Sequence, residues 1–218
     1  PKLSREIIRS AKRCAPSLPI SVKTRLGYNK DELETWLPEL LAENPAVITV
    51  HARTRKEMSL VPARWERVKR AVEIRNELGS KTLILGNGDV PDLETALALC
   101  EETGADGAML GRAVFGNPKL FSNFLPAQAG RELENSLDAD GIRKRLEILL
   151  EHTKLFEELL GDTKNFAVMK KHFKAYVTGF PACAGRDGAS ELRAKLMETG
   201  NANDVGKVVR DFLKNLPN

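Results

Sequence analysis

Four short apolar segments recur along the first half of the chain, and each is followed by a loop and then by helical periodicity. The segments are "ISVKTR", "AVITVH", "TLILG" and "GAMLG", spread over residues 20–111. Between them, "KDELETWLPELLAE", "PARWERVKRAVEIRNEL" and "PDLETALALCEET" space their apolar residues as amphipathic helices do. Strands that alternate with helices predict a parallel sheet. We expect Pro38 to kink or shorten the first of these helices.

Only helical patterns follow Phe121, and the change occurs around "PAQAGRELENSLDADG". One apolar stripe ends at Gly161, and a second begins at Phe166. The first stripe contains Ile142, Leu146, Leu149, Thr153, Phe156 and Leu160, and the second contains Phe166, Met169, Phe173 and Val177. We therefore expect an α/β domain over residues 1–127 and a helical bundle over residues 128–218.

The number of strands is half of what a closed (β/α)8 barrel needs, since such a barrel has eight strands in typically about 250 residues. Four strands alone would leave two unpaired edges. A helix over residues 3–14, with Leu3, Ile7 and Ala11 on one side, has no strand before it. We expect the C-terminal half of a TIM barrel followed by an all-α bundle, in a chain that is the C-terminal part of a longer protein.

The stretch "LILGNGDV" joins a strand to a helix through Asn87-Gly88-Asp89, although Asn-Gly between apolar residues usually indicates a hairpin. Pro91 suits the first position of the next helix. A glycine-containing loop before a helix N-terminus offers backbone N–H groups, which suit a phosphate. A plain turn would have the same sequence.

A similar loop follows the next strand, where "GAMLGRAVFGNP" places Gly111-Arg112 before a short helical segment. In TIM barrels the loops after the last two strands often bind phosphate. Arg112 could supply charge-assisted hydrogen bonds to such a group. The alternative is a surface arginine in an ion pair.

The alternation within the first two strands places polar side chains on one face. Ser21, Lys23 and Arg25 share a face of the first strand, opposite Ile20, Val22 and Thr24. An inward lysine is costly unless it meets an anion or a polar ligand, so Lys23 is a candidate site residue. The second strand ends at His51, and "HARTR" adds Arg53 and Arg55.

The net charge of +4 is modest, but residues 164–195 hold a local excess of five positive charges. Within that stretch, Lys170, Lys171 and Lys174 lie away from the apolar stripe of their helix. They predict a surface for a polyanion, although a solvated helix face would have the same pattern.

Three widely spaced cysteines, Cys14, Cys100 and Cys183, show neither a disulfide framework nor metal-ligand spacing. They favour a reducing compartment, so we expect a cytoplasmic protein without a metal site. No segment is long and apolar enough for a membrane span.

The motifs "SVKTRLGY", "VHARTR", "LGNGDV" and "MLGRAVFGNP", in this order and spacing, resemble the tRNA-dihydrouridine synthase family. The resemblance continues through "VMKKHFKAYVTGF" and "ELRAKLM". It implies a flavin-containing TIM barrel followed by a helical tRNA-binding domain. It also implies an oxidoreductase that reduces the C5–C6 double bond of uridine in tRNA, with FMN recharged by NADPH.

The resemblance also implies roles for individual residues. Lys23 is expected near the flavin ring, His51 at the flavin or the uracil, and Arg25 at the target base. The expected contacts around the FMN phosphate are Asn87, Gly88, Asp89, Gly111 and Arg112, and the expected RNA contacts are Arg53, Lys170, Lys171 and Lys174. We expect a monomer at full length.

The family's catalytic cysteine belongs to a motif upstream of Pro1, so this chain alone should be inactive. Cys14 lacks that motif, and we expect it to be a buried structural thiol. Two alternatives stay open, namely a flavin-free RNA-binding remnant and another phosphate-binding barrel enzyme. The sequence does not indicate which uridine is modified.

Overall fold

The computed structural model describes residues 1–118, 120–121, 138–180 and 188–216, and these form two compact units. The first unit is Pro1–Ala113 and the second is Val114–Asn218. The domain boundary that the sequence predicts near residue 128 lies outside the described residues.

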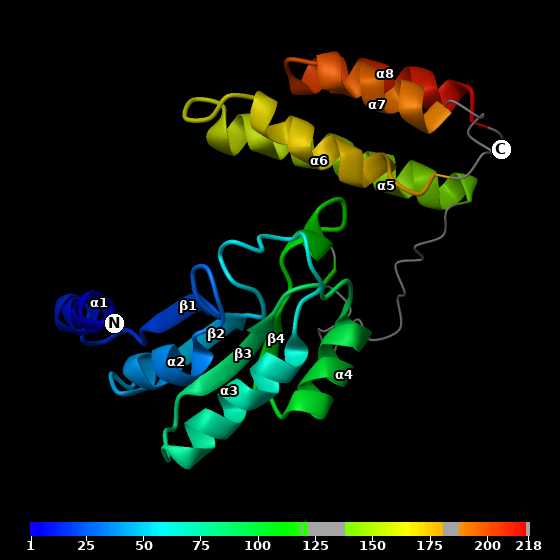
Figure 1. Ribbon diagram of the computed structural model, residues 1–218. Coiled ribbons are helices and arrows are strands. Elements are labelled where there is room, and N and C mark those ends of the chain that lie inside the picture. The colour runs from blue at the N-terminus through cyan, green and yellow to red at the C-terminus, as the bar shows by residue number, and fades with distance from the viewer. Residues whose placement is uncertain (119, 122–137, 181–187, 217–218) are drawn as a thin grey trace. The chain divides into compact units, whose positions relative to one another are not determined.

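Four strands form the sheet of the first unit, one in each of the four predicted apolar segments. They are β1 (Ser21–Arg25), β2 (Val47–His51), β3 (Leu83–Asn87) and β4 (Gly107–Met109). The strands lie in the order β1-β2-β3-β4, and every neighbouring pair is parallel (Figure 1). The predicted parallel sheet is therefore confirmed. Within the described residues, β1 and β4 are its edges.

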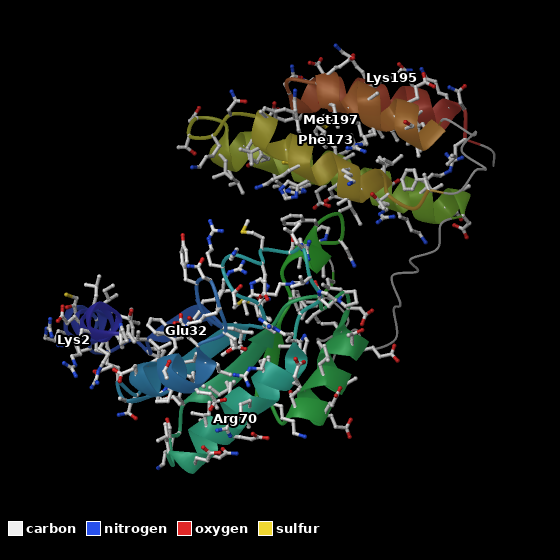
Figure 2. The ribbon with its side chains drawn as sticks, in the orientation of Figure 1. Lys2, Glu32, Arg70, Phe173, Lys195 and Met197 are labelled. Atoms are coloured by element: carbon white, nitrogen blue, oxygen red, sulfur yellow. The ribbon has the colours of Figure 1, made fainter. Side chains whose placement is uncertain are left out.

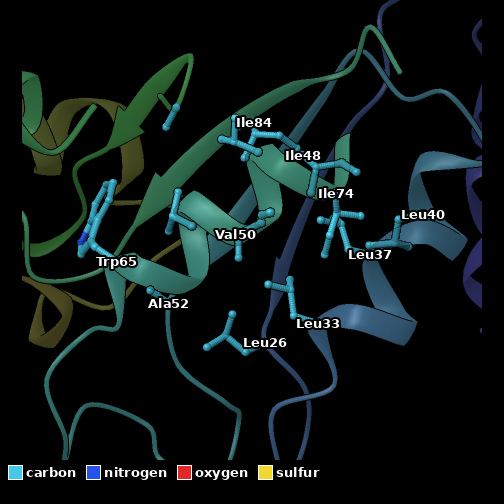
Figure 3. Close-up of a cluster of buried hydrophobic side chains, with 14 of the residues drawn as sticks. Leu26, Leu33, Leu37, Leu40, Ile48, Val50, Ala52, Trp65, Ile74 and Ile84 are labelled. Carbon is cyan, nitrogen blue, oxygen red and sulfur yellow. The ribbon is translucent and has the colours of Figure 1, made fainter. Parts of the chain in front are cut away.

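Helices α2 (Leu33–Leu41), α3 (Trp65–Glu77) and α4 (Leu93–Thr103) connect successive strands, as the periodicity predicts. They cover one face of the sheet, where Ile48, Val50 and Ile84 are fully buried (Figures 1 and 3). Figure 3 shows these side chains with Leu33 and Leu37 of α2 around them. This face is the hydrophobic core, which leaves the opposite face for other chemistry.

Two helices of the first unit, α2 and α1 (Lys2–Cys14), have features that the spacing of their apolar residues does not predict. Pro38 lies inside α2, and the helix continues beyond it to Leu41. In α1 the buried residue is Ile8, whereas Leu3 and Ile7 are exposed. Arg5 holds α1 beside the loop after α2 through its Nε, 2.5 Å from Glu43 Oε1.

The second unit contains α5 (Ala139–Leu160), α6 (Ala167–Val177), α7 (Gly188–Glu198) and α8 (Ala202–Lys214). Both predicted apolar stripes enter its core: Phe173, labelled in Figure 2, is fully buried, as are Ile142, Leu146 and Met169. At the ends of the stripes, Leu160 is exposed and Phe166 is only partly buried. Gly161 caps α5, as predicted.

Candidate functional site

The four parallel strands end in register at the same end of the sheet. Their carboxyl ends form the edge that carries the candidate site, as distinct from the outer strands β1 and β4. Arg25 is paired with His51, His51 with Asn87, and Asn87 with Met109. Side chains at paired positions of a parallel sheet point to the same face. The structure thus brings Arg25, His51 and Asn87 together, as the sequence predicts.

Lys23 lies two residues before Arg25 and therefore on the same face of the sheet. Thr24 points to the opposite face, where its hydroxyl accepts a hydrogen bond from Trp36 Nε1 at 2.8 Å. Partial burial lowers the pKa of Lys23 from its usual value, and the nearby charge of Arg25 lowers it further. A cation that is partly desolvated beside a second cation favours an anionic or polar ligand.

The loop after β3 has a left-handed backbone conformation, which explains how Asn87-Gly88 can precede a helix. Gly88 has φ of 123° and Asp89 has φ of 52°, both in the left-handed region. Trp65 at the start of α3 donates from Nε1 to the carbonyl of Gly88 at 2.8 Å. The loop turns outward toward α4 and forms no hairpin, because its neighbour β4 is parallel.

The first position of α4 differs from the prediction. The helix begins at Leu93, and Asp92 is its N-cap, with a carboxylate oxygen 2.7 Å from the backbone nitrogen of Thr95. Pro91 therefore lies before the helix, because Asp92 at the N-cap position accepts a hydrogen bond from one of the first free N–H groups of the helix.

Asn87 and His51, which are paired on neighbouring strands, differ in character: Asn87 is held by a hydrogen bond, and His51 is uncharged. Asn87 Nδ2 donates to the carbonyl of Met109 at 2.6 Å, which ties the end of β3 to the end of β4. Burial lowers the pKa of His51 to about 4, and the positive charges of Arg25, Lys23 and Arg53 act in the same direction. His51 is therefore a neutral imidazole near pH 7.

The structure buries Arg53, against the prediction that it contacts RNA directly, and only 3% of the residue is exposed. Its Nε donates to the carbonyl of Val61 at 2.6 Å, and its Nη2 forms an ion pair with Asp89. The periodicity of "HARTR" did not predict this burial, because the partner carboxylate lies 36 residues further along the chain.

Asp89 links the loops of this edge. Its Oδ2 accepts from Arg53 and, at 2.9 Å, from the backbone nitrogen of Ala63. Its Oδ1 lies 3.3 Å from Arg112 Nη2. The hydrogen bond from Arg53 is the main reason that the pKa of Asp89 is lowered. A charged carboxylate with these partners organises cations and does not itself attract a phosphate.

The loop after β4 leads into η1 (Arg112–Val114), the short helical segment that the sequence predicts. The Arg112 side chain is 69% exposed, so its guanidinium is accessible apart from the one contact with Asp89. A Cβ on Gly111 would meet no described atom within 4 Å. Arg112 and the loop amides can thus receive an anion.

A cavity of about 670 Å³ lies beside the end of β1. Arg25 borders it and donates from Nη1 to the carbonyl of Thr54 at 2.9 Å. The sequence did not predict that Tyr28 and Trp36 would line this cavity, because no periodic signal marks them. The lining residues are Lys23, Thr24, Arg25, Gly27, Tyr28, Glu32, Trp36 and Arg55.

Cys14 and Cys100 lie away from this edge. Cys14 is exposed at the end of α1, so the prediction of a buried thiol is wrong, because only Ile8 of that helix is buried. Cys100 is partly buried, and burial raises the pKa of its thiol. Cys183 lies outside the described residues.

The predicted cationic residues of the second unit lie on α6. Lys171 and Lys174 are exposed and Lys170 is partly buried. Lys195 on α7 is exposed too, but its Nζ lies 2.7 Å from Glu191 Oε1. The lysines of α6 therefore carry part of the accessible positive charge that the sequence predicts, and Lys164 and Arg193 are exposed as well. Arg186 and Asp187 lie outside the described residues.

Over the described ranges 1–118, 120–121, 138–180 and 188–216, no helix has the length and apolar character to cross a membrane.

Comparison with known proteins confirms the resemblance that the motifs indicate. The sequence model of "Dihydrouridine synthase (Dus)" matches residues 1–216. A "Probable tRNA-dihydrouridine synthase 2" of Bacillus subtilis (strain 168) is 37% identical over 213 residues, which are 97% of this chain and 60% of that protein. A "Probable tRNA-dihydrouridine synthase" of Staphylococcus aureus (strain Mu50 / ATCC 700699) is 37% identical over 214 residues, 97% of this chain and 59% of that protein. The chain thus spans about 60% of the length of these relatives. It belongs to the dihydrouridine synthase family.

Proposed function

We propose that the whole protein is a tRNA-dihydrouridine synthase that reduces the C5–C6 double bond of uridine in tRNA, with FMN as cofactor and NADPH as reductant. The names of its relatives support the reaction. The observation that carries the proposal is the set of strand ends in register, with Lys23, Arg25, His51 and Arg112 around one edge of a parallel sheet.

The residues at this edge fit the phosphate of FMN. Gly88 and Asp89 hold the loop after β3 in the left-handed region, which presents backbone N–H groups, and Gly111 leaves space beside Arg112. Arg112 would bind the phosphate through charge-assisted hydrogen bonds. Asp89 would orient Arg112 and the loop, and would not contact the phosphate itself, because both are negative.

The residues on the face of the sheet opposite the helices fit the flavin ring. Lys23 would meet a polar edge of the ring, and Asn87 would keep the β3 and β4 ends at a fixed distance through its bond to Met109. His51, as a neutral imidazole, would contact the flavin or the uracil. When bound, FMN supplies the hydride, and the protein orients it and excludes water.

The proposal includes a catalytic cysteine outside residues 1–218. Cys14 precedes the N-terminal end of β1, and Cys100 lies in the second half of α4, which runs back toward that same end of the sheet. Both thiols are therefore at the wrong edge to protonate a substrate near His51. We place the cysteine and the remaining barrel strands in the part of the relatives that this chain does not match.

The lysines of α6 would bind tRNA, and Arg25 would face the target base. Double-stranded and folded RNA is bound mainly through its phosphates, which suits exposed Lys171 and Lys174. A uridine inside folded tRNA must be unstacked to reach the strand ends. A cytoplasmic location fits a tRNA substrate.

The test is purification of the whole protein and measurement of its flavin absorbance and of NADPH-dependent dihydrouridine formation in unmodified tRNA. We expect bound FMN and dihydrouridine. A colourless protein that takes up no FMN at saturating concentration but retains tRNA would support the RNA-binding alternative. FMN without tRNA binding or dihydrouridine would support another barrel enzyme.

A further inference from the structure

The guanidinium of Arg53 joins three segments at the edge of the sheet. Its Nε donates to Val61 in the loop before α3, and its Nη2 pairs with Asp89 in the loop after β3. Its Nη1 lies 3.4 Å from Nε2 of His51 at the end of β2. Because the arginine is buried and each of its three nitrogens has a partner, its orientation is fixed.

The contact between Arg53 and His51 can have only one direction. A guanidinium carries hydrogen on every nitrogen and accepts no hydrogen bond at ordinary pH. Nε2 of His51 must therefore be the acceptor and must lack a proton. A neutral imidazole has one proton, which then resides on Nδ1.

The two edges of the histidine ring have different surroundings. A Cβ on Gly88 would lie 3.2 Å from His51 Cδ2 and 3.4 Å from Nε2, so the backbone of Gly88 covers this edge of the ring. The Nδ1–Cε1 edge lies on the other side of the ring. Among the described residues, Nδ1 of His51 forms no hydrogen bond.

The charges around His51 oppose a second proton. Lys23 and Arg25 on β1 and Arg53 beside the ring are positive, and each lowers the pKa of the imidazole. Asp89 acts in the opposite direction, but its carboxylate is shared between Arg53, Arg112 and the Ala63 amide. Among the described residues, an imidazolium at this position would find no uncommitted acceptor.

We propose that Arg53 is a positioning residue that fixes His51 as a neutral imidazole with its proton on Nδ1. His51 is then a hydrogen-bond donor toward a ligand at the strand ends, and it takes no part in proton transfer at neutral pH. The ligand would present an acceptor there, such as a carbonyl oxygen or an unprotonated ring nitrogen of a flat heterocycle. This last step rests on the proposed function, whereas the tautomer does not.

The test is nitrogen-15 NMR of the whole protein labelled at histidine, over a pH range from 5 to 8. The signals of His51 are those missing from the His51→Gln variant. We expect Nδ1 to carry the proton and Nε2 to be unprotonated throughout this range. A protonated Nε2 in the wild-type protein would overturn the proposal without any variant of Arg53.

The variant Arg53→Met removes the donor and keeps much of the side-chain volume. We expect the proton of His51 to move wholly or partly to Nε2 and its pKa to rise, since one of three positive neighbours is lost. Arg55→Met is the matched control, because Arg55 lies in the same loop and forms no contact with His51. The tautomer should not change in this control.

A folded Arg53→Met variant with an unchanged tautomer would contradict the proposal. If this variant fails to fold, Arg53→Lys keeps the charge but loses the planar fork, and the expected result is again a change of tautomer. FMN titration of the same samples tests the proposed function separately from the tautomer of His51. No FMN binding with the expected tautomer would refute the proposed function alone, and FMN binding with the opposite tautomer would refute this inference alone.

Discussion

Gly86 on β3 lies directly against the ring of Trp65 on α3: a Cβ at this glycine would be 2.2 Å from Cζ3 of the indole. The same tryptophan donates its N–H to the carbonyl of Gly88. A glycine in the middle of a strand thus allows a large aromatic side chain to hold the loop that carries Asp89. The hydrophobic core and the candidate site depend on each other at this point.

We expect Gly86→Ala to destabilise the protein by about 1–3 kcal/mol, because the indole must move away and its bond to Gly88 is then strained or broken. The measurement is urea unfolding of the whole protein. Gly107→Ala is the matched control, since a Cβ on this other strand glycine would meet Leu85 Cγ at an ordinary 3.5 Å. Equal stability loss in both variants would contradict the role of Trp65.

Asp89→Asn should lower the free energy of unfolding at pH 7 by about 1 kcal/mol. This is below the usual ~1.5–3 kcal/mol of hydrogen bonds to charged groups, because the Asp89 side chain is 40% exposed and solvent screens its charge. The pKa of Asp89 is lower in the folded protein than in the unfolded chain, where it is about 3.9. Its contribution is therefore fully present above that value and is lost as the pH falls through the lower folded pKa.

Unfolding curves between pH 7 and pH 3 measure this effect. The wild-type protein should lose more stability on acidification than Asp89→Asn does. Asp211→Asn is a control for a generic surface carboxylate, since Asp211 is exposed and its ion pair is with the lysine three residues away, Lys214. Parallel pH curves for the wild-type protein and Asp89→Asn would exclude the role of this ion pair.

Arg112→Ala should weaken FMN binding by about 10- to 150-fold, which corresponds to one charge-assisted hydrogen bond of 1.5–3 kcal/mol. Stability should change little, because the side chain is 69% exposed. The measurement is FMN titration of the whole protein followed by absorbance. Lys69→Ala on the exposed side of α3 is the control, and a similar loss in both variants would indicate nonspecific electrostatics.

The double variant Lys171→Ala/Lys174→Ala should weaken tRNA binding more at low salt than at high salt. If both side chains contact phosphates, the slope of log affinity against log salt concentration should fall by about 1.4–1.8. Lys214→Ala is the control, because its Nζ lies 2.9 Å from Asp211 Oδ1. An unchanged slope in the double variant would remove α6 from the RNA interface.

Periodicity predicted the elements well, because strands and helices here have distinct spacing of apolar residues. It also placed Lys23, His51 and Asn87 at one edge, since parallel strands end together. It missed the burial of Arg53, because the side chain is held by a carboxylate from another strand end, and local sequence carries no signal for that pair. The sequence also predicted a buried Cys14, because cysteine is usually buried, but Ile8 is the only buried residue of α1.

The strand register has a consequence for how such a protein can change over evolution. Along β2 the core residues Ile48 and Val50 alternate with Thr49 and His51, so one inserted or deleted residue within the strand would exchange the two sets. His51 would then point into the helices, and Val50 would take its place at the end of β2 on the opposite face. We therefore expect the loops between the strands to accept changes in length that β2 itself cannot, because a loop can lengthen without exchanging the two faces of the sheet.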